Sequence, residues 1–461
     1  MKKNWADFRG TSLVLGAVFT LSYLVSCVSD QGPQKGAPIP LENLTAKKRQ
    51  IPIPAQPSDF EQKQLLKASD LVTPELLQGE HHTLEEYVQT DGFTNTYTIV
   101  SEFGTFKAHG DAMLPIRVHE IDVIATLRDL PKRTGYVGGV ADAVTRPVRG
   151  AWDVIKDPVD TVAGIPQGGY RWFRRVQEMV EGERGELEDS VAEELVGFAQ
   201  AKREWAYNLN VNPYSSNKVL QKELNTVAWI AISGNYTVMV ATFPISGPAS
   251  LALSFTNTAK NMDSILRDLS PEDLRKRNRA KLESMNVGEN VLEEFLEHPW
   301  YSPRHETILV EALANLEGVS NIGAFIKVAV EAESEEEAFF FQRMAEMMLG
   351  YHELVSPGQE ILVSNHIPLL YTKNQHLVLT IMLDYGWWSS EAHSISTTLT
   401  AFSPANRTIT TREFWVSGKL SPRAKNELEA RGWKVEVDGM TKLLARRQLR
   451  ERTFIYREVE D

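Results

Sequence analysis

The sequence predicts an α+β fold that is mainly helical, with a small β/α element near the N-terminus, a central multi-helix array and a small α/β unit at the C-terminus. Three observations lead to this prediction. Threonine and aromatic residues are concentrated in residues 89–107, amphipathic segments follow one another over residues 270–356, and strand-like and helix-like segments alternate after Pro357. Alternating strands and helices form a parallel or mixed sheet, which defines the C-terminal unit.

The first 26 residues have the layout of a secretory signal. Residues 1–10 carry three basic side chains against one acidic side chain, and residues 11–26 are uncharged. A basic segment before a short apolar segment is typical of signal peptides, and the apolar run is shorter than the roughly 18–20 residues of a membrane span. Small Ser26 stands directly before Cys27, the only cysteine of the chain.

The tetrad Leu24-Val25-Ser26-Cys27 resembles the lipobox of bacterial lipoproteins. The resemblance covers only the first 27 residues. It implies cleavage between Ser26 and Cys27, a diacylglyceryl thioether on the Cys27 sulfur and a fatty acyl group on the new N-terminus. Such chains together anchor a protein durably to a bilayer. Because Val28 rather than aspartate follows, the resemblance implies the outer membrane of a bacterial cell envelope; the alternative is an ordinary signal or anchor helix.

A cysteine that carries lipid leaves the mature chain without a thiol, which excludes disulfides, thiolate zinc sites and cysteine nucleophiles. Removing residues 1–26 takes three basic residues and one acidic residue from totals of 49 and 61, which leaves 46 and 60 and a net charge of −14. An acidic body argues against a nucleic-acid partner. We therefore expect an envelope protein or the cell wall as partner, beside the membrane that holds the lipid.

Residues 27–75 are expected to form a flexible tether, because they begin with a stretch rich in proline, glutamine and glycine that has no helical or strand period. The next region, residues 76–180, begins with a predicted strand pair over residues 89–107, in which Gly92 and Gly104 mark turns. Apolar residues at spacings of three and four then predict an amphipathic helix over residues 115–130, laid on the sheet.

Two segments have compositions that suit contact with lipid. Residues 137–180 contain a repeated Pro-Val pattern and end in arginines interleaved with aromatics, which suits a membrane interface. The alternative is a strap of short helices around the domain. Residues 224–259 carry no charge, but glycine and proline interrupt them, which favours a buried helical hairpin within the helical region 181–269.

Residues 270–356 contain five amphipathic segments separated by short breaks. Ser334 and Glu337 have the spacing of a capping box at the start of the last segment. Short connections imply antiparallel neighbours, in a compact bundle or an irregular solenoid. Residues 357–461 then predict a sheet of three strands with right-handed helical crossovers.

Ligands of open α/β sheets bind outside the carboxyl ends of the strands. Asp384, Tyr385, Trp387 and Trp388 follow the first predicted strand of this unit, and Lys419 follows the second. We expect these residues to converge on one edge, where paired tryptophans beside a carboxylate can stack a sugar or a cation. The alternative is that the tryptophans cap the core against neighbouring helices.

Catalytic and cofactor motifs give little support to an enzyme. The chain has no G-x-S-x-G, no H-E-x-x-H, no Walker A motif and no strand-linked G-x-G-x-x-G, so neither a metal nor a cofactor is expected. Ser215-x-x-Lys218 is a four-residue match without a K-T-G triad. The sequence therefore favours a non-enzymatic interaction or structural module. The alternatives are a membrane-active or lipid-handling protein that uses residues 137–180 and 224–259, and an envelope hydrolase with a pocket near Asp384 and Lys419.

Overall fold

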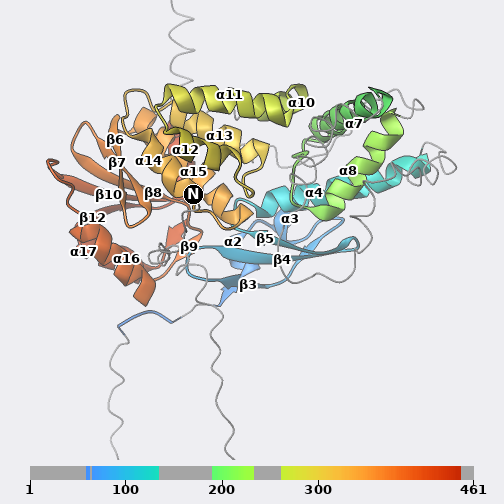
Figure 1. Cartoon of the computed structure of the whole chain (residues 1–461). Coiled ribbons are helices and arrows are strands. Elements are labelled where there is room, and N and C mark those ends of the chain that lie inside the picture. Colours follow the sequence, from blue (N-terminus) through green and yellow to red (C-terminus); the bar gives the residue numbers. More distant parts are fainter. Residues whose placement is uncertain (1–58, 63–64, 134–188, 233–260, 448–461) are drawn as a thin grey trace, which may run out of the picture.

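The computed structural model describes residues 59–62, 65–133, 189–232 and 261–447, which form an α+β protein that is mainly helical. The predicted fold class is therefore confirmed. The N-terminal sheet and its helices occupy one side of the molecule and the C-terminal sheet the other, with the helical array above and between them (Figure 1). The signal segment with Cys27, residues 137–180 and most of residues 224–259 lie outside the described residues. None of the helices in the described ranges is both long and apolar enough to cross a membrane.

The N-terminal sheet is antiparallel and has five strands in place of the predicted pair. Its order is β1 (Leu66–Lys67), β3 (Tyr87–Thr90), β4 (Asn95–Ser101) and β2 (Thr83–Leu84), with β5 (Gly104–His109) also paired to β4. Two short helices, α2 (Ala68–Leu71) and α3 (Pro74–Leu77), precede β2. Gly92 and Gly104 have φ of +97° and +128°, a region that favours glycine, so both mark turns and divide residues 87–109 into three strands.

The folded body begins earlier than the predicted tether allowed. Glu61 accepts hydrogen bonds from the Ser421 hydroxyl and from the Trp388 N–H, both at 2.6 Å. The Glu61 N–H in turn donates to the Trp388 carbonyl at 2.8 Å. Residues 59–62 and 65–75 therefore belong to the body, and the flexible segment predicted for residues 27–75 is too long by these residues.

Helix α4 (Leu114–Arg133) is covered on two sides. Val118 and Ile121 pack against the sheet, as the apolar spacing predicted. Ile124 and Leu127 instead pack against α7 (Asp189–Asn208) and α8 (Lys218–Ile230), which lie beside α4 in Figure 1. The N-terminal unit therefore has two small apolar clusters of its own.

The five predicted helices of the array are all present. They are α11 (Pro271–Ser284), α12 (Glu289–Leu296), α13 (Pro303–Ala314), α14 (Ile322–Ala329) and α15 (Glu335–Leu354), preceded by the short α10 (Met262–Asp268). Ser334 caps α15, because its hydroxyl accepts from the Glu337 N–H at 3.1 Å. The Glu337 side chain accepts from the Glu333 N–H rather than from Ser334, so the reciprocal half of the predicted capping box is displaced by one residue.

The C-terminal sheet is mixed, with the order β12 (Trp433–Glu436), β10 (Thr411–Val416), β8 (His376–Ile381), β7 (Ile367–Thr372) and β6 (Gly358–Ser364). The strands β8, β10 and β12 are parallel and are connected through α16 (Ser390–Ala401) and α17 (Pro422–Ala430), as predicted. The antiparallel hairpin β6–β7 was not predicted. The sheet and the helical array bury their apolar side chains in one common core, separate from the clusters around α4.

Candidate functional site

A cavity of about 320 Å³ lies where the N-terminal unit, the helical array and the C-terminal unit meet. Its walls come from α4, the loop between α7 and α8, α13, α15 and the loops after β8 and β10. The polar part of the lining consists mainly of Asp111, Arg117, Glu120, Ser215, Ser216, Arg304, His305, Glu335, Gln342, Arg343, Glu346 and Asp384. Cavities of this size hold small molecules, so its walls form the candidate site.

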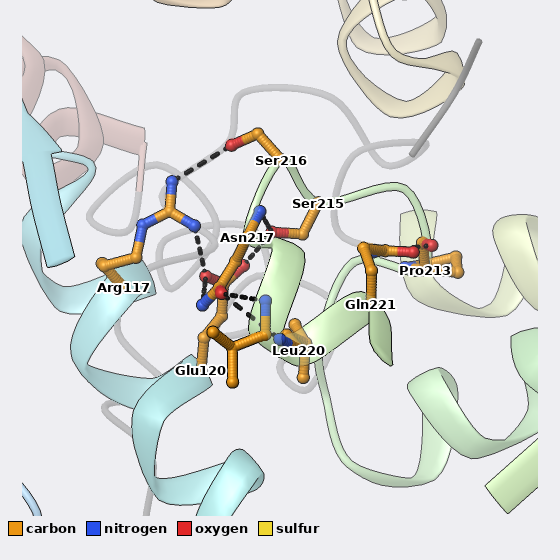
Figure 2. A network of polar contacts seen from close by, with 9 residues as sticks. Arg117, Glu120, Pro213, Ser215, Ser216, Asn217, Leu220 and Gln221 are labelled. Atoms are coloured by element: carbon orange, nitrogen blue, oxygen red, sulfur yellow. Dashed lines mark hydrogen bonds and ion pairs between the residues drawn. The ribbon is translucent and has the colours of Figure 1, made fainter. Parts of the chain in front are cut away.

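One wall is a network of polar contacts between α4 and the loop that joins α7 to α8 (Figure 2). Arg117 donates to Glu120 at 2.7 Å and to the Ser216 hydroxyl at 3.2 Å. Glu120 also accepts from the Ser215 hydroxyl and, at 3.0 Å, from the Asn217 side-chain amide. Arg117 and Glu120 are three residues apart on one helix, so they face the same side. The Glu120 carboxylate, which is 2% exposed, is thereby fully engaged with donors.

The loop that carries these serines is held in place by α8. Asn217 caps this helix by accepting from the Val219 and Leu220 N–H groups, both at 3.2 Å. Lys218 is exposed, whereas Ser215 is buried and donates to Glu120. The pair Ser215-x-x-Lys218 therefore does not form the arrangement of a nucleophile with its base.

Helix α15 supplies a second wall. Arg343 donates to Glu346 at 2.9 Å, and the Gln342 amide nitrogen donates to the same Glu346 oxygen at 3.2 Å. Glu346 and Gln342 are 1% and 4% exposed. Glu335, the first residue of α15, accepts a hydrogen bond from Ser216. Burial raises the pKa of Glu335 to about 7. This wall thus mixes a matched ion pair with a carboxyl group that titrates near neutrality.

Helix α13 contributes Arg304 and His305. Arg304 pairs with Asp263 at 2.5 Å. His305 is 6% exposed, and burial together with Arg304 lowers its pKa to about 3, so the imidazole is neutral. Within the part of the chain that the structure describes, the His305 Nδ1 and Gln342 Oε1 atoms are buried without a hydrogen-bond partner. Both residues line the cavity, so it contains unused hydrogen-bonding capacity.

Asp111 and Asp384 complete the lining at the boundary with the N-terminal sheet. Asp384 accepts from the Asn95 backbone N–H at 2.8 Å, and Asp111 accepts from the Tyr97 hydroxyl at 2.6 Å and the Asn95 side-chain amide at 2.9 Å. Burial, and then the neighbouring Asp111, raise the pKa of Asp384 well above its ordinary value. Asp384 therefore holds the start of β4 against the C-terminal unit.

The loop after β8 and the loop after β10 lie side by side, as predicted, but their side chains do not converge on one pocket. A parallel pairing of β9 (Tyr385–Gly386) with β11 (Lys419–Leu420) places Tyr385 opposite Lys419. Trp387 and Trp388 are only 6% and 2% exposed and line a second, apolar cavity of about 140 Å³. The Lys419 side chain is exposed, Tyr385 is half-buried, and neither lines either cavity.

Of the five residues predicted for a pocket, only Asp384 lines the central cavity. The tryptophans pack in the core, as the alternative interpretation expected: Trp388 lies 4.5 Å below the Arg431 guanidinium and meets the His393 ring edge-on. An open platform for stacking a sugar is therefore not formed by these two side chains.

Sequence reasoning missed most of the cavity, because its lining residues come from seven stretches of the chain that are far apart in sequence. One signal was visible in α15, where Arg343 and Glu346 stand three residues apart within a long apolar run. Charged residues at core-facing positions need partners, so such a pair marks either an internal ion pair or a site. In the structure Arg343 and Glu346 form an internal ion pair and also line the cavity.

Comparison with known proteins adds no relative: no family model, no curated protein and no solved structure matches the chain. Among residues 59–62, 65–133, 189–232 and 261–447, no three His, Cys, Asp or Glu side chains lie together in a way that could hold a metal ion. The candidate site is therefore interpreted from its own geometry.

Proposed function

We propose that this protein is a lipid-anchored, non-enzymatic binding protein of the bacterial cell envelope, and that its central cavity binds a small ligand. The observation that carries the proposal is the cavity of about 320 Å³ in which Gln342 and His305 keep buried polar atoms without partners. A buried polar atom without a partner costs roughly 1–3 kcal/mol, and a ligand that supplies the missing hydrogen bond recovers this energy.

The hydrogen bonds around the cavity support binding rather than catalysis. The Ser215 hydroxyl donates to Glu120, and Asp384 accepts from backbone, so both are committed to neighbouring protein groups. A nucleophilic serine needs a base that is itself oriented by a third group, and Glu120 is instead neutralised by Arg117. The groups in the walls therefore fix the shape of the cavity.

The anchor in this proposal is the lipid on Cys27, from the resemblance of residues 24–27 to a lipobox. If residues 28–58 form the flexible tether that their composition predicts, a chain of this length would hold the body on the order of 30 Å from the bilayer. The proposed location is the outer membrane. The substitution Cys27→Ala should leave unprocessed precursor that incorporates no labelled palmitate. Normal labelling of that variant would contradict lipidation at Cys27.

A second candidate is an envelope hydrolase, favoured by one observation. Asp111 and Asp384 are close enough that the charge of one raises the pKa of the other, and such acid pairs serve in general acid–base catalysis. The backbone hydrogen bond to Asp384 weighs against this function. The membrane-active alternative depends on residues 137–180 and 224–259 and stays a prediction.

The binding proposal is tested by filling the cavity. Ala112 lines it and is half-buried, so Ala112→Phe places a ring inside without removing a hydrogen bond. The control is Ala430→Phe at an exposed position at the end of α17. In a thermal-shift screen of small polar and amphipathic compounds, those that raise the melting temperature of the unmodified chain and the control should have no effect on Ala112→Phe. Equal shifts in all three proteins, or no active compound, would contradict a binding cavity.

A further inference from the structure

The positive charges in the wall of the central cavity are matched within the protein. Arg117 pairs with Glu120 at 2.7 Å and Arg343 with Glu346 at 2.9 Å. Arg304 pairs with Asp263 at 2.5 Å. Each guanidinium therefore has a carboxylate in contact, and an anionic ligand would have to compete with that carboxylate.

Three further carboxyl groups in the wall are outside these pairs. Asp111 accepts from the Tyr97 hydroxyl and the Asn95 amide, Asp384 accepts from a backbone N–H, and Glu335 accepts from Ser216. These donors are all neutral. Among the described residues, no direct ion pair joins any of the three to a Lys, Arg or His side chain; the nearby charge of Arg117 only offsets part of the rise in the Glu335 pKa. The lining therefore has more acidic groups than its arginines neutralise.

The unused hydrogen-bonding capacity is of the accepting kind at Gln342. Its amide nitrogen donates to Glu346, and because a carboxylate only accepts, this contact fixes the orientation of the amide group. The Oε1 atom therefore faces away from Glu346, is buried, and lacks a donor among the described residues. A neutral His305 adds an Nδ1 atom that can accept in one of its tautomers. A complementary ligand brings N–H donors.

The remaining lining is apolar and adaptable. It consists mainly of Met113, Ile116, Ile308, Phe339, Met382 and Met440. Methionine side chains fit ligands of varied shape, and the Phe339 ring adds apolar surface. A ligand with an apolar part and one cationic end therefore matches both halves of the cavity.

We propose that the central cavity binds small amphipathic amines, with the ammonium group directed to the acidic groups and Gln342 Oε1 and with the apolar part against the methionines and Phe339. This inference rests on the proposed binding function and names the chemistry of its ligand. The surplus of acidic groups in the wall and the unpartnered acceptor at Gln342 support it independently, since one concerns carboxyl groups that can ionise beside an ammonium group and the other a single buried atom.

The test uses three probes with the same phenyl group and different ends: phenethylamine, 2-phenylethanol and 3-phenylpropionate. Calorimetric titration of residues 28–461, which contain every described element, should give a dissociation constant for the amine at least tenfold lower than for the alcohol, with the carboxylate weakest. Tighter binding of the carboxylate, or equal binding of all three, would overturn the amine preference.

Two substitutions assign the preference to the wall. Glu335→Gln removes one acidic group, and Gln342→Leu removes the unpartnered acceptor; each should weaken amine binding at least fivefold, and Glu335→Gln should leave alcohol binding unchanged. The control Glu85→Gln makes the same charge change at an exposed position that does not line the cavity. Unchanged amine affinity in both wall variants would overturn the inference.

The outcomes separate this inference from the proposed function. If all three probes bind equally and Ala112→Phe abolishes their binding, the cavity binds ligands but does not select amines. If none of the three binds while other compounds act in the thermal-shift screen, the inference fails and the binding function stands. Failure of both experiments removes the binding function itself.

Discussion

The two faces of helix α15 border two different cavities, and the contrast between them distinguishes the face that packs in the core from the face that lines the candidate site. The polar cavity of about 320 Å³ meets one face, and the apolar cavity of about 140 Å³ meets the other. Residues three or four apart share a face of a helix. The polar face carries Glu335, Phe339, Gln342, Arg343 and Glu346, and the apolar face carries Glu337, Phe340, Phe341 and Met344.

The difference follows from what covers each face. The apolar face packs into the core that the helical array forms with the C-terminal sheet. The polar face meets the N-terminal unit, whose apolar clusters are separate from that core. A boundary between separate cores buries less apolar surface, so space and polar groups are tolerated there.

The largest expected effect belongs to the apolar face. Phe341 is 1% exposed and lies edge-on to Phe325 and Phe340, so Phe341→Ala should lower the free energy of unfolding by about 3–5 kcal/mol in urea titration. The matched change on the polar face, Phe339→Ala, removes a half-buried ring and should cost about 1 kcal/mol. Equal losses from the two variants would remove the contrast between the faces.

A smaller effect is expected across the polar cavity. Asp384→Ala leaves the buried Asn95 N–H without its acceptor, which should lower the free energy of unfolding by about 1–3 kcal/mol. The exposed Lys419 is the control, and Lys419→Ala should change stability by less than about 0.5 kcal/mol. If Asp384→Ala is as stable as the control, the carboxylate does not hold the boundary, and the hydrolase candidate gains support.

The smallest effect concerns Glu335, whose folded pKa is raised from 4.5 to about 7 mainly by burial. Arg117 opposes the shift, and Glu336 and Glu120 add to it. Between pH 4.5 and pH 7 the folded chain binds more protons at Glu335 than the unfolded chain, so this group lowers the free energy of unfolding as pH rises. Glu335→Gln should therefore be more stable than the unmodified chain above pH 7, by about 1 kcal/mol after allowance for solvent screening.

The pH dependence has its own control. Glu85→Gln changes the charge equally at an exposed site, so its stability should follow the unmodified chain at every pH. Denaturant titrations at pH 4.5, 6 and 8 distinguish the two variants. A Glu335→Gln variant that is less stable at pH 8 would mean that the ionised carboxylate stabilises the fold.

The sequence predicted the elements that local signals define. Serine before proline marked the starts of α11, α13 and α17, and in each the serine hydroxyl accepts from the N–H three residues later. The β6–β7 hairpin was not predicted, because its turn contains no glycine or proline. The turn is formed instead by Asn365 and His366, both with positive φ.

The candidate site was predicted only at Asp384. The rule that ligands bind at the carboxyl ends of parallel strands placed this residue correctly at a boundary, and it lines the cavity. Trp387 and Trp388 were assigned to the same pocket, but both side chains are buried and line the second, apolar cavity instead. Arg117 and Ser216 lie 99 positions apart in sequence, and no local pattern can show that they meet.

The contact of Glu61 with Trp388 and Ser421 has a mechanical meaning. If the proposed lipid anchor holds the N-terminus at a membrane, a pull on the residues before Asp59 enters the fold at Glu61. The load then falls on the loop that carries Trp388 and, four residues earlier, Asp384. Tension on such a tether would therefore act first on the boundary between the N-terminal and C-terminal sheets, which lies beside the cavity, rather than on the helical array.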